Sequence, residues 1–410
     1  MDAREQFALL QRGTAEILPA EDLQRKLEHS VRTGKPLRVK LGLDPSAPDL
    51  HLGFSIPLRK LRQFQDLGHE VVLIIGDFTA MIGDPSGKSE TRRPLSTEEV
   101  EINARTYAEQ YSIILDPDRT RVVFNSQWLG PMTFYDVIHL TSKYTVARLL
   151  ERDDFAKRMA EGRPIAVHEF LYAFCQAYDS VHLQADVELG GTDQRFNILM
   201  ARDIQREYGQ EPQVAVFMPL LVGLDGVQKM SKSLGNTIGL REPPEEMYAK
   251  VMSIGDGLMH DYYEYLTQIP MAEARRQIEA DPMAAKRRLA REMVASFHSA
   301  TAAREAESVW ERIHRKRQLP ESMPELLLPA DAVKPDGSVW LARLLTLAGM
   351  AAGTREARRL VEQGGVLVDG QRVTDPDAEI PVREGTVVQV GRRRFVRVAG
   401  IQKQEEGAAV

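Results

Sequence analysis

The sequence contains little that would cross-link the chain or anchor it in a membrane. It has one cysteine, Cys175, in 410 residues, which excludes an intrachain disulfide and a zinc site built from several thiolates. Its longest apolar run, Val71 to Gly76, is far shorter than the roughly 20 residues that cross a bilayer. The N-terminus, Met1 to Glu5, lacks the basic start and apolar stretch of a secretory signal. We therefore expect a cytoplasmic protein with no membrane span.

The chain also lacks the positive charge of a protein that coats nucleic acid. Its net charge is -6 at pH 7, which argues against general, nonspecific binding to RNA or DNA. The charge is unevenly spread, because ten Arg, no Lys and seven acidic residues lie between Ser338 and Gly400. We therefore expect no DNA partner, and any basic surface to be local to this segment.

The length and the 43% of hydrophobic residues are typical of a globular protein with two or three domains. From residue 37 to about 224, short β-rich runs alternate with longer helical patterns, which predicts a parallel sheet with crossover helices. The expected strands are Leu37–Leu43, Glu70–Gly76, Arg121–Asn125 and Gln213–Phe217, and the expected helices are Leu52–Leu67, Thr97–Leu115, Val167–Tyr178 and Thr192–Tyr208. Such a doubly wound, Rossmann-like α/β domain binds ligands beyond the carboxyl ends of its strands.

The rest of the chain changes character twice. From Pro243 to about Arg317 helical spacing replaces the strand pattern, which predicts an all-α domain. A Pro-rich stretch from Leu319 to Pro335 resembles a linker, and a small α+β segment follows it. The predicted domains are residues 1–235, 236–325 and 338–400, with a linker over 326–337.

Two short motifs in the α/β domain indicate phosphate chemistry. The run His51–Gly53, His-Leu-Gly, follows an expected strand and opens an expected helix, where main-chain N–H groups and the helix dipole favour a nucleotide's phosphates. The run Lys229–Ser233, Lys-Met-Ser-Lys-Ser, lies in a Gly-flanked loop whose two ammonium groups could gather on a polyphosphate as charge develops. An ordinary strand-to-helix turn and a solvated polar loop are the alternative interpretations.

Together, the early His-Leu-Gly turn and the late Lys-Met-Ser-Lys-Ser loop resemble the joint signature of class I aminoacyl-tRNA synthetases. Three further runs are similar to those of bacterial tyrosyl-tRNA synthetases, in the same order and at similar spacing: Gly42–Gly53, Gly76–Lys88 and Gly190–Gln194. The resemblance covers almost the whole chain. It implies an enzyme that uses ATP with Mg²⁺ to activate L-tyrosine and load it onto tRNA(Tyr), acting as a homodimer and without protein-bound zinc.

The run Gly83–Ser89 looks like a phosphate-binding P-loop. It is one residue short of Gly-x-x-x-x-Gly-Lys-Ser/Thr, so its N–H groups would be out of register, and we reject that interpretation. The family resemblance instead implies that Asp84 binds the ammonium group of the substrate. It also implies that Lys88 and Arg92 act on the polyphosphate in the transition state.

Three polar residues of the expected helix 167–178 and the turn that follows it share one face. Tyr172, Gln176 and Asp179 are spaced i, i+4 and i+7, where an amphipathic helix would normally bury apolar side chains. This indicates a ligand, with surface exposure as the alternative. The resemblance implies that Tyr172 and Gln176 hold the α-amino group, while Asp179 accepts a hydrogen bond from the substrate's phenol.

Other roles follow from the resemblance alone. It implies an ATP and adenylate site formed by Asp44, Ser46, His51, Gly53, Thr79, Asn125, Gly191, Asp193, Leu221, Val222 and Lys232, with Gln194 at the tyrosine. His51 also belongs to the implied catalytic set, with Lys229 and Lys232. Trp128 and Glu188 are interpreted as supporting structure.

Two positions depart from the family pattern. The early motif ordinarily ends in a second His, whereas this chain has Phe54, which cannot make a side-chain hydrogen bond to ATP. Many bacterial members have a Tyr at the substrate phenol where this chain has Lys40, so the resemblance implies that Lys40 lies at the tyrosine site. We therefore expect phenol recognition to depend more heavily on Asp179.

The C-terminal segment looks like the alpha-L RNA-binding module shared with ribosomal small-subunit protein four. Its residues Arg343, Arg355, Arg358 and Arg359 could form one basic helical face against RNA phosphates. A solvated charged face is the alternative.

The implied chemistry needs no nucleophilic Ser or Cys, because the tyrosine carboxylate is already ionised and attacks the α-phosphate itself. The enzyme supplies placement and charge stabilisation for the departing pyrophosphate. Two other functions stay open at this point. One is activation of tryptophan by the same fold, and the other is a noncatalytic RNA-binding protein, for which Phe54 is the warning sign.

Overall fold

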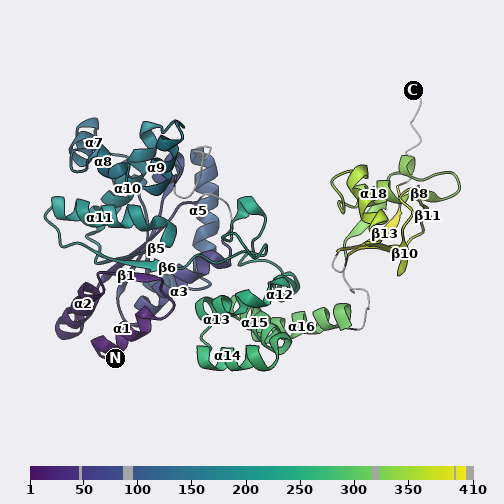
Figure 1. Ribbon diagram of the computed structural model, residues 1–410, viewed down its shortest axis with the longest axis horizontal. Coiled ribbons are helices and arrows are strands. Elements are labelled where there is room, and N and C mark those ends of the chain that lie inside the picture. Colours follow the sequence, from purple (N-terminus) through teal and green to yellow (C-terminus); the bar gives the residue numbers. More distant parts are fainter. Residues whose placement is uncertain (46–48, 86–95, 316–322, 392–393, 403–410) are drawn as a thin grey trace. The chain divides into compact units, whose positions relative to one another are not determined.

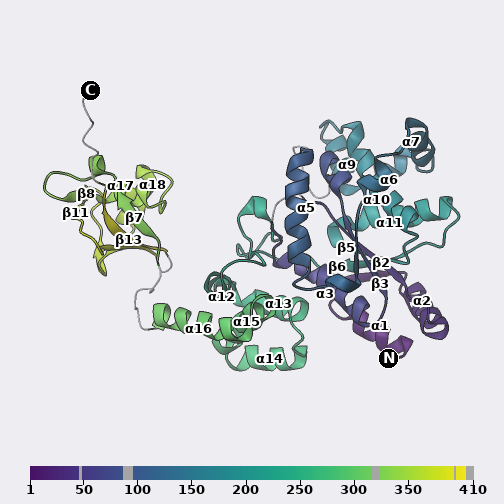
Figure 2. The same ribbon diagram turned by 180° about the vertical axis from the view of Figure 1, so that it is seen from behind.

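A computed structural model describes residues 1–402 except 46–48, 86–95, 316–322 and 392–393. The chain forms two compact units, residues 1–307 and 308–410, each with its own sheet (Figures 1 and 2). No helix among the described residues is long and apolar enough to cross a membrane.

The first unit is built on a six-stranded sheet in the order β1-β6-β5-β2-β3-β4. Five strands are parallel, and β1 pairs with β6 in the antiparallel direction at one edge. The strands are β1 Glu16–Leu18, β2 Arg38–Leu43, β3 Glu70–Ile75, β4 Thr120–Phe124, β5 Val187–Gly191 and β6 Val214–Met218. Residues 71–75 of β3 are all buried, as expected for an apolar strand covered on both faces of a parallel sheet.

Helices cover both faces of this sheet (Figure 1). One side carries α1 Ala3–Gln11, α2 Ala20–Thr33 and α3 Leu52–Asp66, and the other carries α10 Val167–Leu183 and α11 Arg195–Glu207. The other helical elements of this part of the chain are α4 Asp77–Ile82, α5 Thr97–Tyr111, η1 Pro117–Arg119, α6 Ser126–Leu129, α7 Phe134–Thr141, α8 Val146–Leu149, α9 Asp153–Ala160, η2 Thr192–Gln194 and η3 Lys232–Leu234. The long helices are buried on the sheet side, as Leu58, Leu61 and Phe64 of α3 show.

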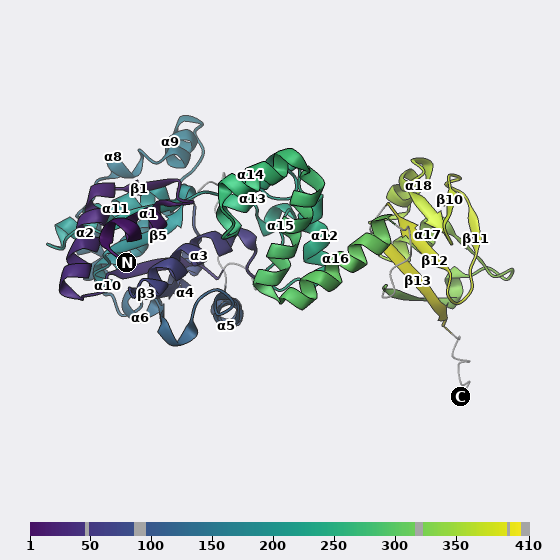
Figure 3. The ribbon, with the colours of Figure 1, turned by 90° about the horizontal axis from the view of Figure 1, so that it is seen from below.

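A helical region follows the sheet in the chain. It consists of α12 Pro244–Ser253, η4 Asp256–Leu258, α13 Met259–Leu266, α14 Met271–Ala280, α15 Pro282–Phe297 and α16 Ala300–Arg315. Helices α13, α14 and α15 pack together, α12 packs on α15, and α13 also packs on α3 (Figure 3). The contact with α3 places this region in the same compact unit as the sheet up to residue 307.

The second unit contains a five-stranded sheet in the order β10-β9-β12-β13-β7 and a two-stranded sheet of β11 and β8. Its elements are β7 Glu325–Leu328, η5 Ala330–Ala332, β8 Ser338–Trp340, α17 Leu341–Leu347, α18 Thr354–Glu362, β9 Val366–Val368, β10 Gln371–Val373, β11 Glu379–Pro381, β12 Val387–Val390 and β13 Arg394–Ile401. Its core packs Leu341, Leu345 and Val361 of the two helices against Val388 and Val396 of the sheet.

The predicted fold class is confirmed: a doubly wound parallel sheet, a helical region and a small α+β unit. Two strands of the six-stranded sheet were missed, since β1 has only three residues and β5 carries Glu188 and two glycines in its five. The helix expected over 192–208 begins at residue 195, after the turn η2, and α10 runs on to residue 183. Strand β7 lies partly within the stretch expected to be a linker and pairs with β13. The predicted domain boundaries stay a prediction.

Candidate active site

A cavity of about 260 Å³ opens at the carboxyl ends of the parallel strands, where the doubly wound fold predicts a ligand. Its wall combines strand ends from β2, β3, β5 and β6 with one face of α10 and the loop that follows β6. Most residues predicted for the site meet here: Asp44, His51, Gly53, Thr79, Asp84, Asn125, Tyr172, Gln176, Asp179, Gly191, Asp193, Gln194, Leu221 and Lys229. Residues separated by up to 185 positions in the chain thus share one wall.

Six predicted residues are not among those found at the cavity wall. Of these, Lys40, Val222 and Lys232 are described but do not form part of the cavity wall. Ser46, Lys88 and Arg92 lie outside the residues that the structure describes.

Asp44, directly after β2, is held by hydroxyl groups from two other elements. Thr79 donates to its Oδ1 at 2.7 Å, and the Tyr172 hydroxyl donates to its Oδ2 at 2.7 Å. Asn125 in turn donates to the Thr79 hydroxyl at 3.2 Å. Gly76 makes this arrangement possible, because a Cβ there would collide with Asp44 and Thr79. A requirement for Gly at this position is visible only in three dimensions.

The ammonium end of the predicted tyrosine site is rich in acceptors. Gln194 donates to Asp84 at 2.8 Å, which orients that carboxylate at the cavity wall. Burial, with the charges of Asp44 and Asp84, raises the pKa of Tyr172 well above its usual range. Tyr172 therefore stays protonated and remains a hydrogen-bond donor to Asp44. Two carboxylates near one cavity wall suit a cationic group of a ligand.

Asp179 is buried at the same wall and is approached by donors. Trp128 Nε1 donates to its Oδ1 at 2.8 Å, and Asn125 Nδ2 lies 3.4 Å from its Oδ2. Burial raises the pKa of Asp179 to about 7, although the charge of Lys40 and both hydrogen bonds act in the opposite direction. Trp128, interpreted from the sequence as supporting structure, thus contacts a predicted binding residue directly.

Lys40 does not line the cavity, although its position in the sequence suggested a contact with the substrate phenol. Its ammonium group pairs with Glu188 at 2.9 Å, and the two side chains are only 1% and 2% exposed. Glu188 also accepts from Gln176 Nε2 at 3.1 Å. Among described residues, Lys40 therefore affects the site through Glu188 and through the pKa of Asp179.

The His-Leu-Gly turn forms the start of α3, as predicted. His51 is the N-cap, and its Nδ1 accepts from the Gly53 main-chain N–H at 3.2 Å. Burial, and then the charges of Lys232 and Lys229, lower the pKa of His51 to about 4. His51 is therefore neutral near pH 7, and because its Nδ1 accepts a hydrogen bond, its Nε2 carries the proton. Phe54 packs its ring on His51, with centroids 4.6 Å apart.

The Lys-rich loop is closed by a residue that the sequence did not single out. Buried Asn236 accepts from the Ser231 main-chain N–H at 2.8 Å and donates to the Lys229 carbonyl at 3.1 Å. Lys229 forms an ion pair with Asp193 at 2.8 Å, and Lys232 lies 3.7 Å from Asp49. Burial lowers the pKa of Lys232, although the charge of Asp49 opposes this effect. Both ammonium groups are held near the cavity by weakly buried partners that a phosphate could replace.

The four arginines predicted to bind RNA lie on the two helices of the second unit. Arg343 of α17 pairs with Asp331 at 2.7 Å, and Arg358 of α18 pairs with Asp377 at 2.5 Å. Arg355 and Arg359 of α18 are exposed. The basic face of α18 is therefore partly neutralised by neighbouring carboxylates.

The sequence matches two known families. Residues 32–315 match the family described as tRNA synthetases class I (W and Y), and residues 339–388 match the S4 domain. The tyrosine–tRNA ligase of Moorella thermoacetica is 59% identical, with 96% of this chain and 95% of that protein covered. The tyrosine–tRNA ligase of Geobacter metallireducens is 55% identical, with 97% and 99% covered.

Solved structures with the same fold are more distant in sequence. Tyrosyl-tRNA synthetase from Archaeoglobus fulgidus, in complex with L-tyrosine, matches with a TM-score of 0.59 at 24% identity, covering 75% of this chain and 100% of that one. A C-terminally truncated mitochondrial tyrosyl-tRNA synthetase from Aspergillus nidulans matches with a TM-score of 0.63 at 20% identity, covering 77% and 94%. These similarities support the fold of the first unit.

Proposed function

The chain belongs to the tyrosine–tRNA ligases of class I, and on that basis we propose that the cavity is where tyrosine reacts with ATP. The products of this step are tyrosyl-AMP and pyrophosphate. The tyrosyl group then passes to the 3′ end of tRNA(Tyr). ATP use follows from the reaction of the family, and the residue roles below are our proposals.

The polar face of α10 is the observation that carries this proposal. Tyr172 and Asp179 are seven residues apart, or about 10 Å along a helix, which is similar to the length of a tyrosine. The Asp179 carboxylate would accept from the phenol, while Asp84, Tyr172 and Gln176 would hold the ammonium group at the other end. A phenylalanine would leave a buried carboxylate without its hydrogen bond, which is costly.

The adenylation step requires placement and stabilisation of charge. The tyrosine carboxylate attacks the α-phosphorus of ATP, and the bond to the β,γ-pyrophosphate breaks with its electron pair on the leaving oxygen. Lys229 would leave Asp193 and act on the pyrophosphate together with Lys232, because charge there grows during the reaction. Neutral His51 would donate from Nε2 to a phosphate oxygen at the start of α3.

Magnesium would enter with ATP. Mg²⁺ prefers hard oxygen ligands, which the phosphates supply, and it neutralises part of their charge. The Lys-rich loop supplies two cations, Lys229 at the cavity wall and Lys232 outside it, so these side chains would bind the phosphates and not the metal. Asp193, which lines the cavity and pairs with Lys229, is a carboxylate that would suit the metal there.

Phe54 occupies the position of the family's second His and packs there against His51, without a side-chain hydrogen bond. Its ring contacts His51 and lines the cavity. This contact would orient the imidazole of His51 but would supply no donor to ATP. The loss of one donor is consistent with an active enzyme if His51 and the loop lysines carry the phosphate contacts.

The S4 domain would bind tRNA through its arginines. Exposed Arg355 and Arg359 would contact phosphates directly, whereas Arg343 and Arg358 would first have to exchange their carboxylate partners. Such contacts carry little sequence information, so they would add affinity and salt dependence rather than choice of tRNA.

A homodimer is supported by an exposed apolar surface on α7. Phe134, Tyr135 and Ile138 are 80%, 79% and 51% exposed, and large exposed aromatic side chains on one helix are typical of an interface. A second copy of the chain could pair the same surface with itself. Light scattering of a Phe134→Ser/Tyr135→Ser variant should give a monomer. Val31→Ser, an exposed apolar position on α2, is the matched control and should leave the dimer intact.

Pyrophosphate exchange tests the proposed function most directly. The protein should catalyse exchange of labelled pyrophosphate into ATP with tyrosine and not with tryptophan. Exchange with tryptophan instead would assign the chain to the other branch of the matched family. No exchange with either amino acid, combined with tight tRNA binding, would indicate a noncatalytic RNA-binding protein.

A further inference from the structure

Glu188 of β5 lies at a point where four hydrogen-bond donors converge. Its Oε1 accepts from Lys40 Nζ at 2.9 Å and from Gln176 Nε2 at 3.1 Å. Its Oε2 accepts from the Ser180 hydroxyl at 3.2 Å and from Gln213 Nε2. The side chain is 2% exposed. Both oxygens of this carboxylate thus accept from donors, and Lys40 is its counter-charge.

An ionised carboxylate next to Gln176 fixes which way the Gln176 amide points. The amide has a donor NH₂ and an acceptor oxygen, whereas the Glu188 carboxylate can only accept. The NH₂ of Gln176 must therefore face Glu188, and its Oε1 is left for the cavity that Gln176 lines. Within the described chain, Gln176 Oε1 has no hydrogen-bond partner. A substrate ammonium group needs such an acceptor and would be repelled by an NH₂ in its place.

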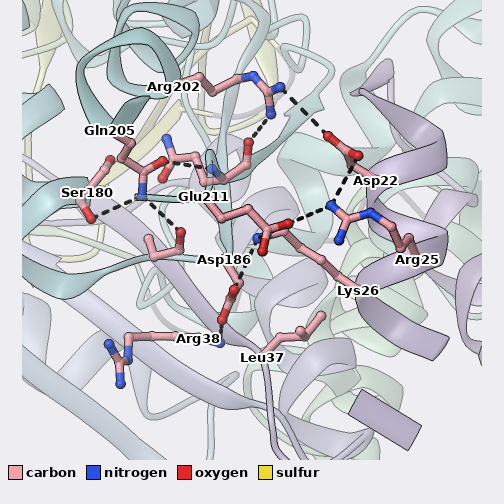
Figure 4. A network of polar contacts seen from close by, with 12 residues as sticks. Asp22, Arg25, Lys26, Leu37, Arg38, Ser180, Asp186, Arg202, Gln205 and Glu211 are labelled. Atoms are coloured by element: carbon pink, nitrogen blue, oxygen red, sulfur yellow. Dashed lines mark hydrogen bonds and ion pairs between the residues drawn. The ribbon is translucent and has the colours of Figure 1, made fainter. Parts of the chain in front are cut away.

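Gln205 of α11 fixes the two residues that donate to the Oε2 of Glu188. Figure 4 shows Gln205 of α11 donating to the main-chain carbonyl of Ser180, at 3.3 Å. Gln205 Oε1 also accepts from the Gln213 main-chain N–H at 2.7 Å, and Arg202 donates to the Gln213 carbonyl. Gln205 is fully buried. It therefore holds both residues whose side chains reach the Oε2 of Glu188.

The same network of polar contacts also includes the beginning of β2 (Figure 4). Asp186, two residues before Glu188, accepts from the Arg38 main-chain N–H at 2.9 Å and from Lys26 of α2 at 3.1 Å (Figure 4). Lys40, two residues after Arg38, therefore meets Glu188 in a defined strand register, which the β2–β5 pairing of Lys40 with Glu188 confirms.

We infer that Glu188 is a positioning residue for amino-acid recognition, which acts by turning the carbonyl oxygen of Gln176 toward the ammonium group of the substrate. Lys40 balances the charge of Glu188 and so takes part in recognition indirectly, without touching the phenol. This inference rests on the proposed role of Gln176 as a ligand of the ammonium group.

The test compares L-tyrosine with 3-(4-hydroxyphenyl)propionate, which has the same phenol and carboxylate but no ammonium group. The ratio of their affinities, measured by calorimetry with the full chain, reports recognition of the ammonium group alone. Lys40→Met/Glu188→Met removes both buried charges and leaves no acceptor facing Gln176. We expect this variant to bind tyrosine about tenfold or more weakly and the propionate with little change.

Glu188→Gln is the matched control. Lys40 can only donate, so it should keep the amide oxygen of the new side chain toward itself and Gln176, while Ser180 and Gln213 can accept from its NH₂. This variant should lose stability, because Lys40 loses its counter-charge, yet keep the affinity ratio. Lys40→Met/Glu188→Met should do the opposite: it should keep its stability and lose the affinity ratio. If the ratio instead follows thermal stability through both variants, Glu188 has only a structural role and the inference is wrong.

Gln176→Leu separates this inference from the proposed function. If Gln176→Leu lowers the affinity ratio but Lys40→Met/Glu188→Met does not, Gln176 binds the ammonium group without help from Glu188, and the inference fails alone. If Gln176→Leu leaves the ratio unchanged, the role of Gln176 is wrong and the inference falls with it. If Glu188→Gln does not fold, the comparison of the double Met variant with Gln176→Leu still decides between these outcomes.

Discussion

Replacing Asp179 by Asn should stabilise the fold at neutral pH and weaken the choice of tyrosine. Burial raises the pKa of Asp179 from its usual 3.8 to about 7, so the folded state disfavours the ionised form. The resulting free-energy cost to the folded state is absent below pH 4, where the carboxyl is protonated in both the folded and the unfolded protein. It grows between pH 4 and 7 and is complete above pH 7. Three pKa units correspond to a cost on the order of 4 kcal/mol.

The stability effect is measured by urea unfolding of both proteins at pH 5 and pH 8. The pKa change predicts that the gain from Asp179→Asn is about 2 to 3 kcal/mol larger at pH 8 than at pH 5. The absolute gain should be smaller than the full cost, because the new NH₂ would face the Asn125 donor. An equal gain at both pH values would refute the claim that burial of this charge limits stability.

The functional effect is measured by competitive aminoacylation with tyrosine and phenylalanine. The amide can still accept from the phenol, but a hydrogen bond to a neutral group is weaker than one to a charge by about 1 to 1.5 kcal/mol. Selectivity should therefore fall about tenfold. Unchanged selectivity would remove Asp179 from phenol recognition, even if the stability prediction holds.

Three further predictions address the other parts of the site. Lys229→Ala/Lys232→Ala should slow adenylate formation about 100-fold or more in pre-steady-state assays while leaving tyrosine affinity nearly unchanged. An equal loss of affinity with normal chemistry would contradict the pyrophosphate role. Trp128→Phe removes a donor to Asp179 and should raise the pKa of this carboxyl, so the midpoint of the pH dependence of tyrosine binding should rise by about one unit. An unchanged pH profile would show that this hydrogen bond does not affect the pKa of Asp179. A chain ending at Arg315 retains the first unit. It should keep pyrophosphate exchange but lose most tRNA charging. Charging equal to that of the full chain across a salt series would contradict the RNA-binding role of the second unit.

Local patterns were enough to predict much of this protein. The apolar runs of β2, β3, β4 and β6 and the long helices between them follow from the alternation of short and long periodic segments, which depends on neighbours in the chain. The shared face of Tyr172, Gln176 and Asp179 follows from helical spacing alone. The His-Leu-Gly turn at the start of α3 is likewise a local feature.

The strand register and the contacts across the sheet required the tertiary structure. The position of Lys40 in the sequence suggested a contact with the substrate, but β5, whose Glu188 and two glycines interrupt the apolar pattern of a strand, brings Glu188 beside it. No periodic pattern in the sequence identifies Trp128 or Asn236. Trp128 contacts Asp179, 51 residues away, and Asn236 contacts Ser231 within a folded loop. Periodicity reports which face of an element is buried, whereas the partner of a buried charge depends on strand order, and that order is decided by packing of the whole sheet.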